Sequence, residues 1–84
     1  MISLDEFVYY MEEDTVADST GEIVWYKGEF DGTSVEVFID PLNDWWTWKA
    51  RRRKEFFDHA DCWKNSAGQA MYSAYYELLQ AHWI

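Results

Sequence analysis

The chain has 84 residues, of which 16 are Asp or Glu and 7 are Lys or Arg, so its formal net charge is −9. This length predicts a single domain over residues 1–84, and an apolar share of 49% excludes a disordered acidic tail. The negative charge argues against direct binding of nucleic acid or of an anionic membrane, because both would repel the chain.

The first predicted element is a short helix. Ser3 and Glu6 have the spacing of a capping box, in which each side chain accepts a hydrogen bond from the backbone N–H of the other residue. An apolar stripe at helical spacing follows, formed by Leu4, Phe7, Val8 and Met11. The acids at 12–14 oppose the helix dipole, so the helix is predicted to end there, and the composition of residues 15–21 is typical of a loop.

Two strands joined by a tight turn are predicted next. Residues Glu22 to Phe30 are rich in strand-forming side chains, and Ser34 to Asp40 alternates strictly between apolar and other residues. The intervening Asp31-Gly32 pair suits a type I′ turn, which needs positive φ at both central residues. Pro41 ends the second strand because it has no N–H for the ladder.

Two helices are expected to complete the chain. Asp44 is the predicted N-cap of a long helix over Trp45–Lys64, which Asn65 would end. Ser66 is then the predicted N-cap of a last helix from Ala67 to about His82. The predicted fold class is α+β in the order α-β-β-α-α, with an antiparallel β-hairpin packed against helices.

The charge is distributed unevenly along the chain. Residues 1–44 carry twelve acids and one base, whereas residues 45–84 have a net charge of +2. The acidic half is either a solubilising surface or a surface that imitates DNA, which carries about one negative charge per 1.7 Å of helix axis. In the second case it would attract the basic groove of a nucleic-acid-binding protein. The candidate partner-binding acids are Glu12, Glu13, Asp14, Glu22, Glu29, Asp31, Glu36 and Asp40.

Aromatic residues make up 20% of the chain, with six Trp, six Tyr and five Phe. These rings either form a dense core or exceed what a small core can hold, in which case some lie in a partner interface or a homodimer seam. Trp45 and Trp46 are the candidate anchors for a partner. At least one of Trp45, Trp46 and Trp48 is expected to be partly exposed.

Five of the bases cluster between Lys49 and Lys54. They could contact phosphates, but the negative field of the whole protein repels nucleic acid. Pairing with the protein's own acids is therefore the favoured interpretation.

No catalytic, cofactor or metal site is predicted. His59 and Cys62 have residue types that bind metals, but a structural zinc site needs four ligands and the only other histidine is His82. No phosphate-binding glycine motif is present, and the surroundings of Cys62 do not suggest an activated nucleophile. We therefore expect a protein that is not an enzyme.

A cytoplasmic location is expected. The single cysteine cannot form an internal disulfide, which favours a reducing compartment. The sequence has no run of 18 apolar residues, and its first residues lack the basic and apolar blocks of a secretory signal.

In its length, net charge, single cysteine and acid-rich first half, the chain resembles the small acidic intracellular proteins with which bacteriophages inhibit host proteins. Anti-CRISPR proteins and DNA-mimicking inhibitors belong to this class. The resemblance implies a non-enzymatic inhibitor that binds a nucleic-acid-processing protein in the host cytoplasm. The alternative is a homodimeric structural or adaptor domain whose aromatic residues fill the dimer seam.

Overall fold

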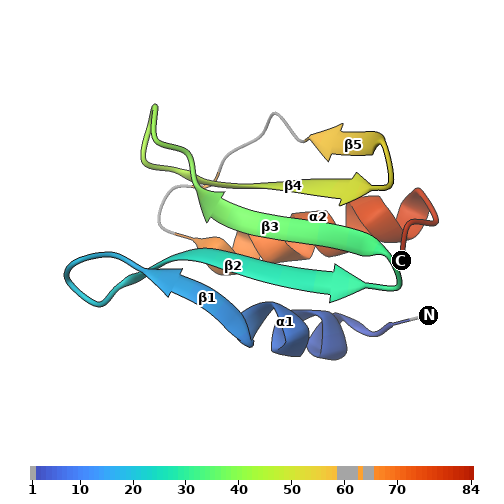
Figure 1. Cartoon of the computed structure of the whole chain (residues 1–84), viewed down its shortest axis with the longest axis horizontal. Helices are drawn as coiled ribbons and strands as arrows, with labels where there is room; N and C mark the ends of the chain where they lie inside the picture. The colour runs from blue at the N-terminus through green and yellow to red at the C-terminus, as the bar shows by residue number, and fades with distance from the viewer. Residues whose placement is uncertain (1, 59–62, 64–65) are drawn as a thin grey trace.

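The computed structural model describes residues 2–58, 63 and 66–84. Two helices and five strands follow one another as α1 Leu4–Glu12, β1 Asp14–Ala17, β2 Ile23–Phe30, β3 Thr33–Ile39, β4 Trp46–Arg52, β5 Glu55–Asp58 and α2 Ala67–Gln80. The strands form one antiparallel sheet in the order β1-β2-β3-β4-β5, so each strand pairs with its neighbour in the chain (Figure 1). The predicted α+β class is confirmed.

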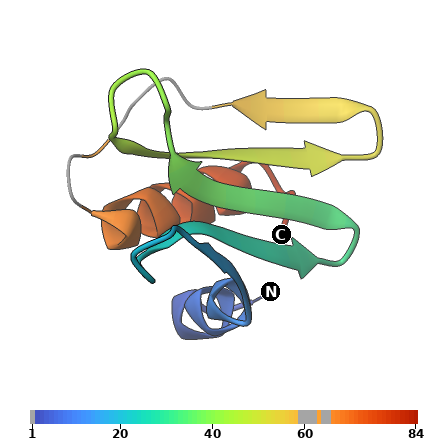
Figure 2. The ribbon, with the colours of Figure 1, turned by 60° about the vertical axis from the view of Figure 1, so that its left-hand side comes forward.

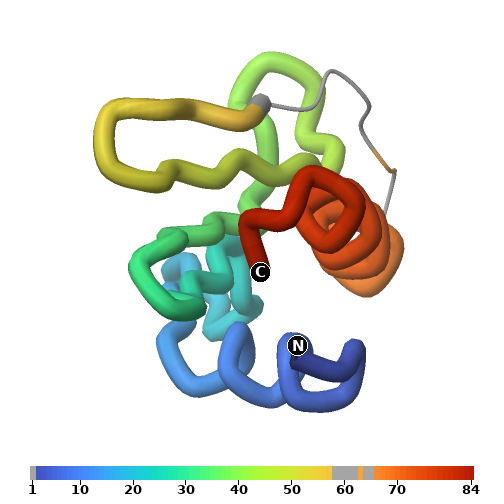
Figure 3. The backbone as a smooth tube through the Cα atoms, turned by 90° about the vertical axis from the view of Figure 1, so that its right-hand side faces the viewer, coloured from blue at the N-terminus to red at the C-terminus, as the bar shows by residue number. Residues whose placement is uncertain are grey.

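Both helices pack on the same face of this sheet. Helix α1 lies along β2, α2 lies across β3 and β4, and the two helices also contact each other (Figures 2 and 3). The core between the helices and the sheet contains Phe7, Met11, Phe30, Val35, Val37, Trp46, Trp48, Ala50, Ala70, Met71, Ala74, Tyr75 and Leu78. The other face of the sheet therefore lacks a helical cover among the described residues.

Helix α1 begins and ends where the sequence predicts. The backbone N–H of Glu6 donates to Ser3 Oγ over 3.2 Å, and the Ser3 hydroxyl donates to the Glu6 carboxylate over 3.1 Å. Phe7 and Met11 are fully buried, and the Phe7 ring stacks on Phe30 with 4.7 Å between centroids. The apolar stripe is thus the face that packs on β2.

The hairpin of β2 and β3 confirms the predicted turn. Asp31 and Gly32 have φ values of 51° and 85°, as a type I′ turn requires. Val35 and Val37 point to the core and are completely buried, while Ile39 is half-buried at the end of β3. The alternation in the sequence correctly gives the face of β3 that meets the helices.

The predicted long helix over Trp45–Lys64 is wrong, and so is the order α-β-β-α-α. This region forms β4 and β5, which are joined by a tight turn at Arg53 and Lys54, with Arg53 at a φ of 58°. Asp44 is not an N-cap, because its φ of 59° places it in the left-handed region just before β4. Burial of alternate side chains in β4 against the helices outweighs the helix propensity of its Lys, Ala and Arg residues.

The expectation of a loop over residues 15–21 is also only partly correct. Asp14–Ala17 form the edge strand β1, which pairs with β2. All four of its residues are exposed, so no buried face marks the strand in the sequence. A turn over residues 18–21 then leads into β2.

Helix α2 confirms the last predicted element. Ser66 Oγ accepts from the backbone N–H of Gln69 over 3.1 Å, and the helix ends at Gln80. Trp48 Nε1 donates to Ser73 Oγ over 3.2 Å, which ties α2 to β4. The predicted end of the preceding helix at Asn65 lies outside the described residues.

Gly28 provides a test of the contact between α1 and β2. A Cβ atom built there would lie 2.7 Å from the Met11 sulfur and 2.8 Å from the Phe30 ring. We expect Gly28→Ala to lower the free energy of unfolding, measured by urea denaturation, by about 1–3 kcal/mol through overpacking. A matched control is Gly68→Ala, where nothing lies within 4 Å of the new methyl group and the free energy should be unchanged or rise by up to about 1 kcal/mol. Equal effects of the two substitutions would contradict this close approach.

Candidate binding surfaces

Four of the predicted acids gather around Tyr10 beside α1 and β2, and Glu12 adjoins them at the end of α1. Tyr10 lines a hollow of about 440 Å³ together with Glu13, Asp14 and Glu29. An adjoining hollow of about 390 Å³ shares Tyr10 and Glu29 and extends to Asp31. Glu12 precedes Glu13 at the end of α1. We refer to this group as the acidic patch: Glu12, Glu13, Asp14, Glu29 and Asp31.

All five carboxylate side chains of the acidic patch are exposed. Lys27 is the one cation that lines the larger hollow, and no acid of the patch forms an ion pair within the described part of the chain. Tyr9 and Tyr10 are 61% and 45% exposed at the same surface, with their rings 5.5 Å apart. The acidic patch thus combines uncompensated negative charge with exposed aromatic surface.

The other three predicted acids lie elsewhere. Glu22 and Asp40 flank the end of the sheet opposite to the Asp31 turn, as the pairing of β2 with β3 shows. The Asp40 carboxylate accepts from the backbone N–H of Leu42 over 2.9 Å. Glu36 lies in the middle of β3, where one of its carboxylate oxygens is 3.3 Å from Lys49 Nζ.

The two predicted aromatic anchors differ from each other. Trp45 is 42% exposed, which confirms that one of the clustered tryptophans reaches the surface. Trp46 is instead a core residue, only 9% exposed, and its backbone exchanges two hydrogen bonds with Trp63. Its assignment as a partner-binding residue is corrected on this ground, because it points inward from β4 and packs against Tyr26.

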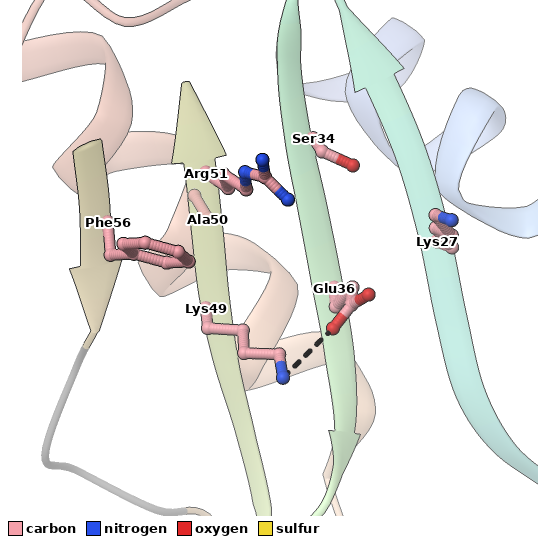
Figure 4. A pocket seen from close by; sticks show the side chains of 7 residues that line it. All are labelled: Lys27, Ser34, Glu36, Lys49, Ala50, Arg51 and Phe56. Atoms are coloured by element: carbon pink, nitrogen blue, oxygen red, sulfur yellow. Dashed lines mark ion pairs between the residues drawn. The ribbon is translucent and has the colours of Figure 1, made fainter. Parts of the chain in front are cut away.

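A second surface is the sheet face that lies opposite the helices. Figure 4 shows its central hollow of about 420 Å³, where Lys27, Glu36, Lys49 and Arg51 project from three neighbouring strands. We refer to this surface as the open face, and its residues on β1 to β5 include Asp14, Val16, Trp25, Lys27, Glu29, Ser34, Glu36, Phe38, Lys49, Arg51 and Phe56. The predicted helix over Trp45–Lys64 conceals this face, because β4 lies within it; the signal that indicates the face is the period-two alternation over residues 46–51.

Within the basic cluster, the expected pairing with the protein's own acids is confirmed for Lys49 alone among the described residues, and two of the arginines bond to backbone carbonyls instead. Lys49 pairs with Glu36 and lies 5.3 Å from the Phe38 ring. Arg51 Nε donates to the backbone carbonyl of Arg53 over 3.0 Å, and Arg52 Nη1 donates to that of His82 over 3.3 Å. These contacts hold Arg51 at the β4–β5 turn and connect β4 to the end of α2.

The candidate metal ligands His59 and Cys62 lie outside the described residues. Among the residues that are described, no group of three or more His, Cys, Asp or Glu side chains could hold a metal ion. Neither α1 nor α2, the two helices described, has the length and apolar character needed to cross a membrane.

Comparisons with known proteins found no matching family model, no matching curated protein and no matching solved structure. The function is therefore argued from the surfaces of this chain. The acidic patch and the open face both combine charge with exposed aromatic side chains.

Asp18, another acid of the first half, is engaged in its own turn. One oxygen of its carboxylate accepts from the Thr20 hydroxyl over 2.6 Å and from the backbone N–H groups of Thr20 and Glu22. These bonds, the Thr20 hydroxyl first, hold the pKa of the Asp18 carboxyl below its ordinary value of 3.8. The stabilisation is therefore fully present above pH 3.8 and is lost as the pH falls through the lower pKa of the folded state.

We expect a carboxyl titration followed by NMR to give Asp18 a pKa below 3.8, and Thr20→Val to raise it because the strongest donor is removed. Ser19→Ala is the matched control in the same turn and should leave the pKa of Asp18 unchanged. An Asp18 pKa that does not respond to Thr20→Val would contradict this arrangement.

Proposed function

We propose that the chain is a non-enzymatic inhibitor that places its acidic patch against the basic surface of a nucleic-acid-binding protein and so excludes the nucleic acid. The observation that carries this proposal is the gathering of four exposed carboxylates in the hollows that Tyr10 lines, with Glu12 next to them in the chain and without an ion pair among the described residues. Free carboxylates on a rigid frame offer a basic groove the same kind of charge that DNA phosphates offer.

The net charge of the whole chain also favours attraction to a basic partner. A net charge of −9 on 84 residues produces a negative field that accelerates encounter with a cationic partner and repels nucleic acid. Because the acids of the patch are exposed, they lose little hydration before the encounter. Long-range attraction therefore comes at small cost to the free protein.

The exposed tyrosines supply the contact that follows the encounter. Tyrosine is enriched among residues that dominate binding energy, because its ring buries a large area while the hydroxyl remains able to bond. Tyr9 and Tyr10 lie beside the carboxylates and their rings contact each other edge to face. Trp45 lies at the far end of the sheet and is not needed for this mode of binding.

A neutralised patch provides the test. The variant Glu12→Gln, Glu13→Gln, Asp31→Asn removes three charges with little change of shape, and the control Glu22→Gln, Asp44→Asn, Glu55→Gln removes three exposed charges elsewhere. The probe is the set of bacterial lysate proteins that a duplex-DNA column retains, applied to each immobilised protein. We expect the patch variant to bind about tenfold more weakly than the control, since three exposed charges each contribute modestly.

Competition with duplex DNA distinguishes a partner that is bound at its DNA-binding surface from one that is held only by nonspecific charge attraction. Duplex DNA should displace the bound proteins from the wild-type chain at an ionic strength that does not elute them by itself. Equal loss of binding in the patch variant and in the control would overturn the role of the patch. Binding that duplex DNA leaves intact would overturn the proposed inhibition.

A further inference from the structure

We propose that two copies of this chain associate through their open faces, with β2 of each copy lying over β3 of the other. This inference does not rest on the proposed function, because it concerns a different partner and a surface that shares only Asp14 and Glu29 with the acidic patch. It starts from the cross-strand register. Asp14 lies opposite Lys27, Lys27 opposite Glu36, and Glu36 opposite Lys49.

These four residues form one row across the open face, since directly paired residues of neighbouring strands project from the same side of a sheet. We refer to Asp14, Lys27, Glu36 and Lys49 as the charged row. Its signs alternate from β1 to β4, and the pair of Glu36 with Lys49 spans 3.3 Å. A row that alternates in this way is complementary to a copy of itself displaced by one strand.

A second row runs parallel to the first and is apolar. Val16 lies opposite Trp25, and Trp25 lies opposite Phe38, with the last two rings 5.9 Å apart. Val16 is 52% and Trp25 is 38% exposed, so this apolar row is available to a partner. Exposed apolar surface beside ordered charge is typical of a specific interface rather than of a solubilising surface.

A two-fold axis that runs along the strands, between β2 and β3, satisfies both rows together. It exchanges β2 with β3 and β1 with β4, and it keeps each residue at its own height along the strand. Lys27 then meets Glu36 of the second copy, Asp14 meets Lys49 of the second copy, and Trp25 meets Phe38 of the second copy. Opposite charges and apolar side chains are therefore matched by one symmetry operation.

Other positions of the axis fit less well. An axis along β3 would place Glu36 on Glu36 of the second copy and Lys27 on Lys49 of the second copy, and like charges in contact are costly. An axis between β3 and β4 keeps the charges complementary, but it places Phe38 over Thr47 of the second copy and leaves Trp25 without its aromatic partner. The apolar row thus selects the axis between β2 and β3.

The size of the face agrees with this arrangement. The molecule extends 35 and 25 Å along its two longer axes, the directions that Figure 1 shows in its plane. A stable interface buries about 800 Å² on each partner. A dimer of ordinary size therefore needs most of the face, and the proposed axis overlays four of the five strands.

Charge exchange provides a test that a structural defect cannot imitate. In Lys27→Glu alone, the new carboxylate would meet Glu36 of the second copy, and in Glu36→Lys alone, the new ammonium group would meet Lys27 of the second copy. We expect sedimentation velocity to show self-association of the wild-type chain, and association at least about tenfold weaker in each variant. An equal mixture of the two variants should associate again, because both contacts become complementary in the mixed dimer.

A pair of aromatic variants tests the apolar row without altering charge. Trp25→Ala should weaken association, whereas Tyr72→Ala removes an exposed ring from α2, on the other side of the sheet, and should not. A strictly monomeric wild-type chain at millimolar concentration would overturn the proposal and leave the face to another partner. Failure of the mixed variants to associate, with circular dichroism showing both to be folded, would also overturn it.

The same measurements separate this inference from the proposed function. The neutralised positions of the patch variant, Glu12, Glu13 and Asp31, lie outside the open face, so that variant should keep its self-association. Loss of DNA-competed binding with an intact dimer would uphold both proposals. A monomer that still binds through the acidic patch would overturn the dimer alone.

Discussion

The packing of both helices on one face of a single sheet is the constraint on which the other features of this protein depend. It requires α1 to approach β2 closely, and Gly28 permits this because Met11 and Phe30 occupy the space that a side chain would fill. Both helices then cover the same face of the five-stranded sheet. The opposite face is left without a helical cover among the described residues, and it presents the charged row beside exposed Trp25.

Strand β4 contributes side chains both to the core and to the open face of the sheet. Its inward side supplies Trp48, the largest fully buried side chain, which stacks on Phe57 at 5.4 Å and donates to Ser73. Its outward side supplies Lys49, the partner of Glu36. A shift of β4 by one residue would exchange these environments and place Lys49 in the core, so the burial of Trp48 fixes the register of the open face.

Helices, strands and turns that are marked by capping or turn residues close by in the chain could be predicted from the sequence. Elements that lack such residues could not be predicted. The predictions of α1, α2 and the central hairpin are correct because each depends on residues close together in the chain. The side chains of Ser3 and Ser66 cap the two helices, and Asp31 and Gly32 adopt the positive φ values of the turn. The β4–β5 turn at Arg53 and Lys54 contains no glycine or asparagine, so the sequence has no turn signal there. The neighbouring Lys, Ala and Arg residues have high helix propensity, which favours the wrong prediction of a helix. The acids of the patch are recognisable by composition, but their gathering depends on the close packing of α1 against β2. Only Asp14 joins them through β1, whose exposed residues carry no buried pattern.

The two candidate surfaces differ in the way that salt acts on them. Attraction between the acidic patch and a cationic groove weakens as ionic strength rises, because the Debye length falls to about 10 Å at 0.1 M. Two copies with a charge of −9 each repel one another at long range, and the same screening relieves that repulsion. Within the dimer, the pairs of Lys27 with Glu36 and of Asp14 with Lys49 are covered, so salt screens them less than it screens exposed charges. The contact of Trp25 with Phe38 of the second copy is apolar and is not weakened by screening. A rise in ionic strength should therefore favour the open-face dimer over binding by the patch. Asp14 and Glu29 belong to both surfaces, so they are the residues through which each interaction affects the other.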